Sequence, residues 1–250
     1  MKKLETHFHT SPISVCSRLT AEAAAEKYAA CGFKAVMLTN HYSRSYIERN
    51  GVEEKEWLEA YIAAYREMLS EGAKRGLEVF LGAEVTLFAP YCQYSRDRYS
   101  AEFLAQNYAD YILIGVNEGF LRTSPMLCDL DLKELHAVCR DNGVLVVQAH
   151  PFRTEQQHSL KDVSLLDGLE INGCVGFCTS CEKEVLSVAA NNGLIVTCGG
   201  DTHYDWHELR SAVYVPDDVN DSVSLARYLE KVRVPKYSLS EEDPFAPPKE

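Results

Sequence analysis

The segment LETHFHTSPIS, Leu4–Ser14, places two histidines one residue apart at the end of the first apolar run of the chain. In a strand, residues two apart point to the same side, so an extended Leu4–Phe8 turns His7 and His9 one way. Two imidazoles in this arrangement either share a ligand or crowd each other. The residues that follow the later strands decide between these interpretations.

Outward from this segment, short apolar runs alternate with amphipathic stretches. The pattern predicts strands at 4–8, 34–39, 78–85, 111–115, 144–149, 167–172, 194–199 and 211–215. It predicts helices at 20–31, 53–75, 100–106, 131–141, 181–191 and 221–232. Strands that alternate with helices indicate a parallel sheet, and seven or so strands that are apolar on both faces favour a closed or nearly closed α/β barrel. We expect a single domain at 1–237 and a mobile, acidic, proline-rich tail at 238–250.

The composition narrows the class of protein. No apolar run approaches 18 residues and no apolar segment follows the first lysines, so we expect no membrane span, no signal peptide and a cytoplasmic location. The net charge of −12 disfavours nucleic acid as a partner. The nine cysteines are odd in number and scattered, which suits buried, reduced thiols. The sequence does not define an oligomeric state.

Polar side chains suited to metal binding follow most of the predicted strands. They are His7, His9, His41, Glu84, His150, Glu170, Asn172, Asp201 and His203. In barrels of this kind the C-terminal strand ends meet at one mouth. A lone histidine at a strand end is more often a surface or capping residue, but five of eight histidines at such positions favour a site. Histidine with carboxylate is a ligand set for Zn²⁺, Mn²⁺ or Fe²⁺.

The motifs THFHT, LTNHY, GAEV, QAHPFR and GGDTH, in this order over residues 4 to about 205, resemble the PHP (polymerase and histidinol phosphatase) family of metal-dependent phosphoesterases. The resemblance implies a distorted barrel of seven strand–helix units that binds two to three divalent ions, Zn, Mn or Fe. It implies one metal held by His7, His9, Glu84 and Asp201, a second held by Glu84 and His150, and a third held by His41 and His203.

Three positions depart from the family's pattern. The family often has a histidine after the strand at 111–115, where this chain has Asn117 and Glu118, and Glu118 is the candidate replacement. A further ligand commonly follows the first motif, and Cys16 is the candidate there, with a buried structural thiol as the alternative. Asn40 replaces the acidic residue of the second motif and is expected to support a ligand rather than bind metal.

The implied reaction is attack of a metal-bridging hydroxide on the phosphorus of a small phosphomonoester or short phosphodiester, because coordination lowers the pKa of water towards about 7. Arg153 is the candidate for binding a phosphate oxygen, with a structural ion pair as its alternative. Arg18 and Arg122 are weaker candidates. His203 is a candidate proton donor to the leaving alkoxide. The acidic composition favours a small phosphorylated substrate over a polymer.

Other patterns have simpler explanations. CVGFCTSC, 174–181, has the C-x3-C-x2-C spacing of a radical-SAM cluster but comes late in the chain, so packing is favoured for Cys174, Cys178 and Cys181. His136 and His158 are expected at the surface and His207 at a rim. A set of tyrosines borders long loops and is a candidate substrate wall, with packing as the alternative: Tyr42, Tyr46, Tyr91, Tyr94 and Tyr99.

Three rival functions remain. A nuclease acting on oligonucleotide ends would need a basic groove, which the composition does not supply. Amidohydrolase-type C–N hydrolases also begin with His-x-His, but the pairing of Asp201 with His203 in GGDTH favours the phosphoesterase. The departures at Asn40 and Asn117 leave a non-catalytic, metal-binding relic of the PHP fold as the last alternative.

Overall fold

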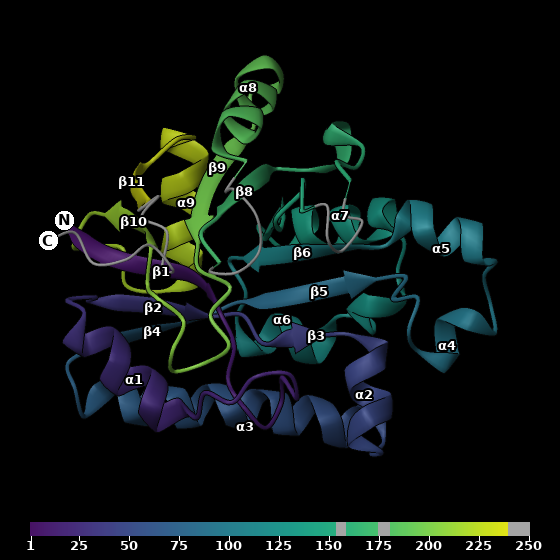
Figure 1. Ribbon diagram of the computed structural model, residues 1–250, viewed down its shortest axis with the longest axis horizontal. Helices are drawn as coiled ribbons and strands as arrows, with labels where there is room; N and C mark the ends of the chain where they lie inside the picture. The colour runs from purple at the N-terminus through teal and green to yellow at the C-terminus, as the bar shows by residue number, and fades with distance from the viewer. Residues whose placement is uncertain (154–158, 175–180, 240–250) are drawn as a thin grey trace, which may run out of the picture.

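The computed structural model describes residues 1–153, 159–174 and 181–239, and in these ranges the strands form two mixed sheets (Figure 1). The five-stranded sheet has the order β11-β10-β1-β2-β4. Its strands are β1 (Lys2–Phe8), β2 (Ala35–Leu38), β4 (Glu78–Leu81), β10 (Ser211–Val215) and β11 (Lys236–Leu239). The six-stranded sheet has the order β3-β5-β6-β7-β8-β9. Its strands are β3 (His41–Tyr42), β5 (Ala83–Leu87), β6 (Ala109–Ile114), β7 (Leu145–Gln148), β8 (Gly168–Asn172) and β9 (Ile195–Gly199).

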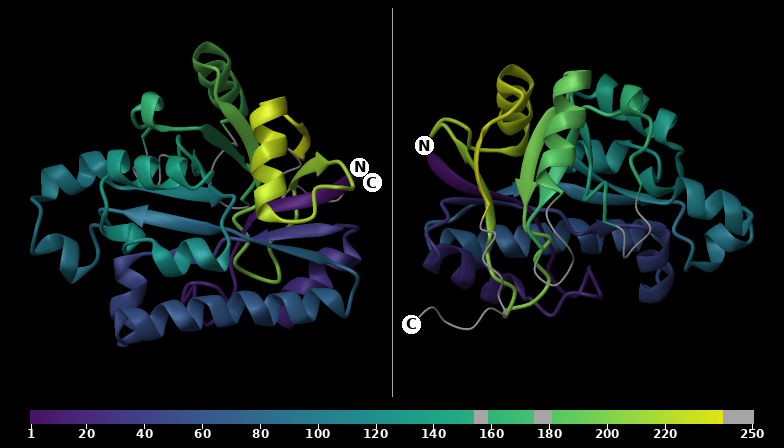
Figure 2. Two further views of the ribbon diagram at one scale, coloured as in Figure 1. Left: turned by 180° about the vertical axis from the view of Figure 1, so that it is seen from behind. Right: turned by 45° about the horizontal axis from the view of Figure 1, so that its top comes forward.

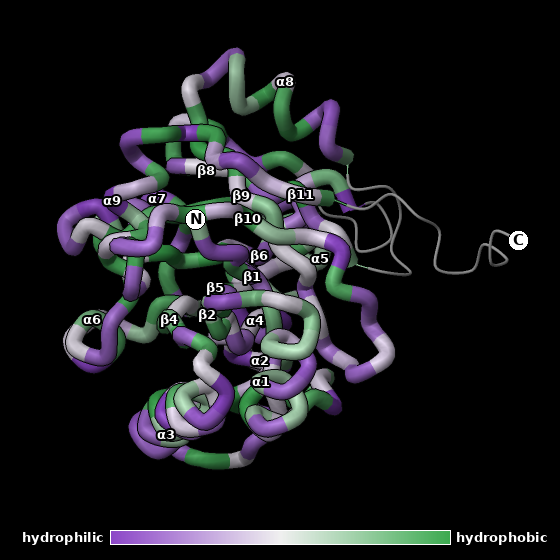
Figure 3. The backbone as a smooth tube through the Cα atoms, turned by 90° about the vertical axis from the view of Figure 1, so that its left-hand side faces the viewer, coloured by the Kyte–Doolittle hydropathy of each residue, from purple (hydrophilic) through white to green (hydrophobic). Residues whose placement is uncertain are grey.

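Helices cover the sheets on two sides. They are α1 (Ala21–Ala30), α2 (Arg44–Asn50), α3 (Glu54–Ala73), α4 (Gln93–Arg96), α5 (Ala101–Asn107), α6 (Glu118–Thr123), α7 (Leu132–Asp141), α8 (Glu182–Asn192) and α9 (Ser222–Val232), with 3-10 turns η1 (Leu127–Asp129) and η3 (Val163–Leu165). Helices α1 and α3 lie together along one side, and α8 and α9 lie on the other (Figure 2). Hydrophobic and hydrophilic residues alternate around the turns of α3 (Figure 3), as expected for a helix with one face on the core. Within the described ranges, no helix combines the length and apolarity needed to cross a bilayer.

The helix ends follow local capping rules. The Thr20 side chain accepts a hydrogen bond from the backbone of Ala23 and begins α1. Asp131 with Glu134 forms a capping box at α7, and Asp221 with Ser224 forms one at α9. These caps explain why the predicted bounds of α1, α7 and α9 agree closely with the observed ones.

The α/β class is confirmed, but the expectation of an all-parallel sheet is wrong. β6 runs antiparallel to both β5 and β7, and β10 runs antiparallel to β1. A parallel crossover needs a helix long enough to return along the sheet face. The helices between β5 and β6, α4 and α5, are short and lie beyond the end of the sheet (Figure 1), so the chain comes back antiparallel.

Two predicted boundaries are also corrected. The single strand expected at 78–85 is two strands, β4 and β5, which belong to different sheets and are separated by Gly82. A Cβ at Gly82 would lie 2.9 Å from Thr39 Cγ2, so only glycine lets the chain pass this close. At the C-terminus, Ser238 and Leu239 belong to β11 rather than to a mobile tail, and 240–250 lies outside the described residues.

The two sheets meet beside the first histidines. β1 is almost completely buried, and just past its end the backbone N–H of His9 donates to Thr202 O at 3.0 Å. Phe8 and Thr202 form an isolated parallel bridge that links β1 to the segment after β9. The end of the first strand is therefore held against the GGDTH segment, which is about 190 residues away in sequence.

Candidate metal centre

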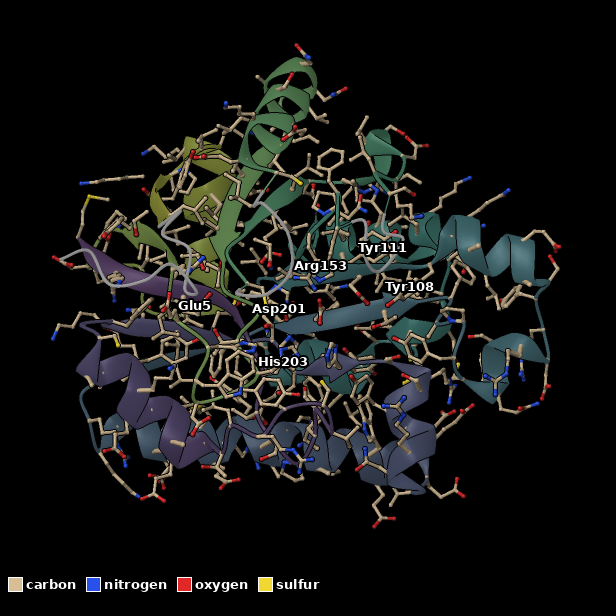
Figure 4. The ribbon with its side chains drawn as sticks, viewed as in Figure 1. Glu5, Tyr108, Tyr111, Arg153, Asp201 and His203 are labelled. Carbon is tan, nitrogen blue, oxygen red and sulfur yellow. The ribbon has the colours of Figure 1, made fainter. Side chains whose placement is uncertain are left out.

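The structure brings the predicted metal ligands together at the junction of the two sheets. They are His7 on β1, His9 just past it, His41 on β3, Glu84 on β5, His150 after β7, and Asp201 and His203 after β9. Asp201 and His203 lie near the centre of the molecule, with Arg153 beside Asp201 and Tyr108 further to the right, toward α5 (Figure 4). The donor atoms form three groups whose members lie within 4.8 Å of one another: His7 with His9 and Asp201, His7 with Glu84 and His150, and His9 with His41 and His203.

The first group has the spacing of ligands around one ion. His9 Nε2 lies 3.1 Å from His7 Nε2 and 3.2 Å from Asp201 Oδ1, and His7 Nε2 lies 3.4 Å from Asp201 Oδ1. Metal–nitrogen bonds of about 2.0–2.1 Å in a tetrahedron separate two ligand atoms by about 3.3 Å. The spacing of His7, His9 and Asp201 therefore fits a transition-metal ion.

The second group contains a buried oxygen that lacks a hydrogen bond. Glu84 Oε1 lies 3.1 Å from His150 Nε2 and 3.3 Å from His7 Nε2. Glu84 Oε2 lies 2.7 Å from His41 Nδ1, which qualifies by distance as an ion pair. The angles do not make a hydrogen bond, and both atoms are without a hydrogen-bond partner among the described residues. Because a buried, unsatisfied carboxylate oxygen is costly, a cation beside Glu84 fits this arrangement.

The third group is a set of stacked imidazoles beside a thiol. The His9 ring stacks at 4.2 Å on both His41 and His203, and the Nε2 atoms of His41 and His203 lie 3.4 Å apart. The Tyr46 hydroxyl donates to Cys16 Sγ at 3.1 Å, and the Tyr46 ring stacks on His41. Burial opposes ionisation of Cys16, but hydrogen bonds with His203 and His41 outweigh it and lower the pKa of the thiol to about 6.

Carboxylates, amides and carbonyls behind the ligands set their orientation. Glu170 Oε1 lies 2.8 Å from His7 Nδ1, which assigns the proton of the neutral ring to Nδ1 and leaves Nε2 to bind metal. Asp201 O lies 2.9 Å from His203 Nδ1 and has the same effect on that ring. Glu170, which the sequence placed only at a strand end, is therefore a supporting residue.

Asn40 has the supporting position expected from the sequence. Its Oδ1 accepts hydrogen bonds from Thr10 N at 2.7 Å and from Ser14 Oγ at 3.0 Å. Ser14 Oγ lies 3.3 Å from His9 Nδ1. Asn40 thus holds the loop that orients His9, and its own side chain is not part of the three ligand groups.

Carboxylates and histidines of the site shift each other's pKa values. Burial would raise the pKa of Glu84 and of Asp201, but the neighbouring His7 and other cations hold both pKa values well below their ordinary range. Burial alone would lower the pKa of His7, yet Glu170, Glu84 and Asp201 raise it well above its usual value. Burial and repulsion from His203 and His41 lower the pKa of His9. In the metal-free chain, protons on histidine therefore substitute for cations.

The backbone is locally strained at two of the ligands. His150 has a φ of +31° and Asp201 a φ of +48°, a region that residues other than glycine rarely adopt. Gly199 lies just before this turn, and a Cβ there would be 2.5 Å from both His7 Cβ and Glu170 Oε1. Gly199, the first glycine of GGDTH, is therefore needed for close packing against His7.

Glu118, predicted as a replacement ligand, is not part of the centre. Its carboxylate makes two hydrogen bonds with Arg66, at 2.8 and 2.6 Å, and Asn117 caps α6. The reason is the reversed direction of β6, whose C-terminal end leads away from the site. Arg122 pairs with Glu59 and Glu118 on the surface and is also remote, and Arg18 is exposed.

The N-terminal end of β6 faces the site instead, which the sequence analysis missed. Asp110 O accepts a hydrogen bond from Ala149 N at 3.0 Å, next to His150. Burial and the nearby Glu84 raise the pKa of Asp110 to about 6. The sequence contains one signal for this end of β6. In NYADY, Tyr108 and Asp110 are two residues apart and so point to the same side of the backbone when the strand is taken to begin there.

Glu5 is a second residue that sequence reasoning missed. Its Oε1 accepts hydrogen bonds of 2.9 Å from the backbone of Thr6, His7 and Gly200. Burial raises the pKa of Glu5 to about 8. Glu5 therefore ties the end of β1 to the GGDTH segment from beneath the metal ligands.

Arg153 lies in the site, with its guanidinium on a ligand. Its Nη2 donates to Asp201 Oδ2 and to Asn172 Oδ1, both at 2.8 Å, and only 5% of its surface is exposed. The structural ion pair considered for Arg153 is therefore present. Arg153 also lines the pocket over these residues.

The other histidines, tyrosines and cysteines singled out in the sequence lie at different places in the structure. His207 lines the pocket, as a rim position implies, although its side chain is mostly buried, and its Nδ1 accepts a hydrogen bond from His203 N at 3.3 Å. Tyr42 is in the core, and Tyr99 packs on Phe88. Tyr94 lies between the guanidinium groups of Arg44 and Arg98. Cys174 is buried and Cys181 partly buried, while Cys178 and His158 lie outside the described residues.

A pocket of about 450 Å³ opens over the three groups. This volume is in the range of small-molecule sites. Its lining consists of Cys16, His41, Tyr46, Glu84, Tyr91, Tyr108, Asp110, His150, Arg153, Cys174, Asp201, His203, Tyr204, Trp206 and His207. The lining combines metal donors that are mostly buried, such as Glu84, His150 and Asp201, with aromatic side chains, of which Trp206 is the most exposed.

No protein-family model and no curated protein sequence matches this chain. Solved structures do match. PsfC from Pseudomonas syringae PB-5123 has a TM-score of 0.60 at 15% identity, over 97% of this chain and 93% of that one. A two-domain protein from Bacteroides vulgatus that contains a predicted PHP-like metal-dependent phosphoesterase has a TM-score of 0.59 at 13% identity, over 93% and 63%. An amidohydrolase from Chromobacterium violaceum has a TM-score of 0.54 at 12% identity, over 86% and 92%. The chain shares its fold with these structures, one of which contains a predicted PHP-like metal-dependent phosphoesterase.

Proposed function

We propose that this protein is a metal-dependent phosphoesterase that hydrolyses a small phosphomonoester or a short phosphodiester. The observation that carries the proposal is the convergence of five histidines, Glu84 and Asp201 into three overlapping donor groups under one pocket. The buried Glu84 Oε2, which accepts no hydrogen bond among the described residues and faces the histidine nitrogens of His41 and His9, supports the presence of a cation. The shared fold agrees with the proposal but does not carry it.

On the basis of the three donor groups, we assign each proposed ion to a set of residues. His7, His9 and Asp201 would hold one ion, and Glu84 with His150 and His7 a second. His41, His203 and His9 would hold a third, with Cys16 as a further donor. When bound, such ions lower the pKa of coordinated water towards about 7 and neutralise charge on a phosphate.

Arg153 has two proposed roles in this reaction. Its bonds to Asp201 and Asn172 position a metal ligand and keep that carboxylate ionised. From the wall of the pocket, its guanidinium is also proposed to attract a phosphate oxygen. The first role predicts an effect on metal affinity and the second an effect on substrate KM.

His203 is proposed first as a metal ligand and second as a proton donor. Its Nδ1 is directed at Asp201 O, and its Nε2 faces His41 Nε2. This orientation supports the ligand role, since the neutral ring then has its lone pair on Nε2. Proton donation to the leaving alkoxide requires a protonated Nε2, and the proximity of Asp201, which raises the pKa of His203, supports that form.

The net charge of the protein supports a small substrate. The net charge of −12 repels polyanions at long range, so nucleic acid is not the proposed partner. Phosphate attraction is local and depends on the metal ligands and Arg153.

The test measures metal content and hydrolysis together. Protein purified without chelator is expected to contain two or more equivalents of zinc, iron or manganese by plasma mass spectrometry, and to release phosphate from 4-nitrophenyl phosphate in a chelator-sensitive reaction. His9→Ala, which removes the residue shared by two donor groups, is expected to lower both. His136→Ala, remote from the pocket, is the matched control. Metal without hydrolysis would favour a non-catalytic binding role, and absence of metal after adding these ions back would refute the proposal.

C–N hydrolysis is the second candidate, favoured by the shared fold of the Chromobacterium violaceum amidohydrolase. A panel of simple amides run beside the phosphate ester separates the two. Chelator-sensitive turnover of an amide with no phosphate release would replace the phosphoesterase proposal.

A further inference from the structure

Trp206 stands at the edge of the pocket with 62% of its surface exposed. The chain contains two tryptophans, and the other, Trp57, is only 1% exposed. A single exposed apolar side chain on an ordinary surface needs no explanation. Trp206 differs because it lines the pocket that contains the buried metal donors. Its exposed ring can therefore contact a ligand that binds in this pocket.

The segment that carries Trp206 is fixed on both sides. Lys27 Nζ donates to Asp205 O at 2.5 Å, and His207 N donates to Tyr204 O at 3.2 Å. His203 N donates to His207 Nδ1 at 3.3 Å, which ties the segment to the metal centre. The position of the indole is therefore coupled to that of a metal ligand only three residues away.

Two neighbouring rings orient the indole. Tyr204 stacks on Trp206 with ring centroids 5.3 Å apart and an angle of 18° between the planes. His207 contacts it edge-on, with centroids 4.4 Å apart and an angle of 77°. An indole held in this way loses little conformational freedom when a flat ligand lies against it. Tyr204, Trp206 and His207 form an aromatic rim on the pocket.

We propose, on the basis of the phosphoesterase function above, that this aromatic rim binds a planar ring in the alcohol half of the substrate. The phosphate belongs at the inner end, where the metal donors and Arg153 lie, so the rim contacts the leaving group. A pocket of about 450 Å³ is large enough for a phosphate, a short spacer and a ring. The substrate class is a phosphate ester of a ring-bearing alcohol, of which nucleoside monophosphates and aryl phosphates are the two available chemistries.

The first experiment compares two esters that carry a planar aromatic ring with one that does not. The metal-loaded protein is assayed with adenosine 5′-phosphate, phenyl phosphate and ribose 5-phosphate. Because loss of one stacking partner commonly weakens binding of a base about tenfold or more, Trp206→Ala should lower the ratio of kcat/KM for the ring-bearing ester to that for ribose 5-phosphate by about tenfold. Trp206→Phe, which keeps a ring, should restore most of the ratio. Phe103→Ala, an exposed aromatic outside the pocket lining, is the control and should leave the ratio unchanged.

The second experiment measures binding in the first milliseconds after mixing, before the ester is hydrolysed. With Trp57 buried, ligand-dependent changes in tryptophan emission report mainly on Trp206. Stopped-flow mixing of the metal-loaded protein should show rapid, saturable quenching by adenosine 5′-phosphate or phenyl phosphate, and none by ribose 5-phosphate. The ester that quenches at lower concentration identifies whether the ring is a nucleobase or a simple aryl group. Phosphocholine tests the competing idea that the indole binds a cation.

The outcomes separate this inference from the proposed function. Hydrolysis of all three esters with a ratio unaffected by Trp206→Ala would overturn the ring contact and leave the phosphoesterase intact. Quenching by phosphocholine but not by the ring-bearing esters would also overturn it. Hydrolysis of 4-nitrophenyl phosphate but of none of these three esters would overturn the ring contact, whereas hydrolysis of none of the four by the metal-loaded protein would refute the proposed function itself.

Discussion

Glu170 Oε1 lies 2.8 Å from His7 Nδ1, and both side chains are completely buried. Glu170→Gln replaces an acceptor carboxylate by an amide and weakens its control of the His7 tautomer. Loss of such a partner costs about 10- to 100-fold in metal affinity. Competition with a chromogenic chelator should show this loss, while the exposed Glu230→Gln should bind metal as the parent does. Unchanged affinity in Glu170→Gln would contradict a role for the His7–Glu170 pair in metal binding.

Arg153 and Asp201 form a buried ion pair, and we expect its contribution to the free energy of unfolding to depend on bound metal. Removing one partner of such a pair leaves an uncompensated charge and costs about 3–5 kcal/mol. We expect Arg153→Met to lower the free energy of unfolding by about this amount in chelator. Metal bound to Asp201 should reduce the loss, because it supplies the missing positive charge. Urea denaturation with and without Zn²⁺ measures both values, and an equal loss in the two conditions would argue against Asp201 as a ligand.

Asp110 predicts a pH dependence of stability in the metal-free protein. Burial and Glu84 raise its pKa to about 6, so the folded state holds the proton more tightly than the unfolded state. The contribution of Asp110 is therefore favourable below the unfolded pKa and is lost as pH rises through about 6. Asp110→Asn should gain stability over the parent by on the order of 1 kcal/mol between pH 5 and pH 8. Thermal unfolding of both proteins in chelator at the two pH values measures this difference. If the stability of Asp110→Asn relative to the parent fell as the pH rose, the prediction would be refuted.

Cys16 predicts a spectroscopic signature. If its thiolate binds a metal beside His41 and His203, Co²⁺-substituted protein should show a sulfur-to-cobalt charge-transfer band in the near ultraviolet. Cys16→Ser should abolish this band, because a hydroxyl is a much poorer ligand than a thiolate. Cys31→Ser, at an exposed position, is the matched control. A band that survives in Cys16→Ser would assign the sulfur to another cysteine.

Gly199 predicts a steric effect on the centre. A Cβ at 2.5 Å from His7 Cβ and Glu170 Oε1 must displace one of them. Gly199→Ala should lower the free energy of unfolding by about 1–3 kcal/mol and weaken metal binding as well. Gly119→Ala on α6, where the nearest atom is Asn117 Oδ1 at 3.1 Å, provides the comparison for both measurements. Normal metal affinity in Gly199→Ala would show that His7 tolerates the shift.

The alternation of apolar runs and capped helices was sufficient to predict the α/β class and most element positions. The period of two in a strand was also sufficient to place His7 and His9 on one side, where their Nε2 atoms now lie 3.1 Å apart. These features depend on neighbours close in sequence, which is why pattern and capping reveal them.

Only the tertiary structure decided which ends of the strands meet. Strand direction depends on the path of the connection, and the short helices α4 and α5 return the chain antiparallel, which no local pattern records. The reversal of β6 removed Glu118 from the centre and brought Asp110 and Tyr108 to it. Glu170 and His7 are 163 positions apart and lie on strands of different sheets, so the packing of the two sheets brings them within hydrogen-bond distance. Arg153 and Asp201 are 48 positions apart and follow β7 and β9 of one sheet, so the order of strands in that sheet brings them together.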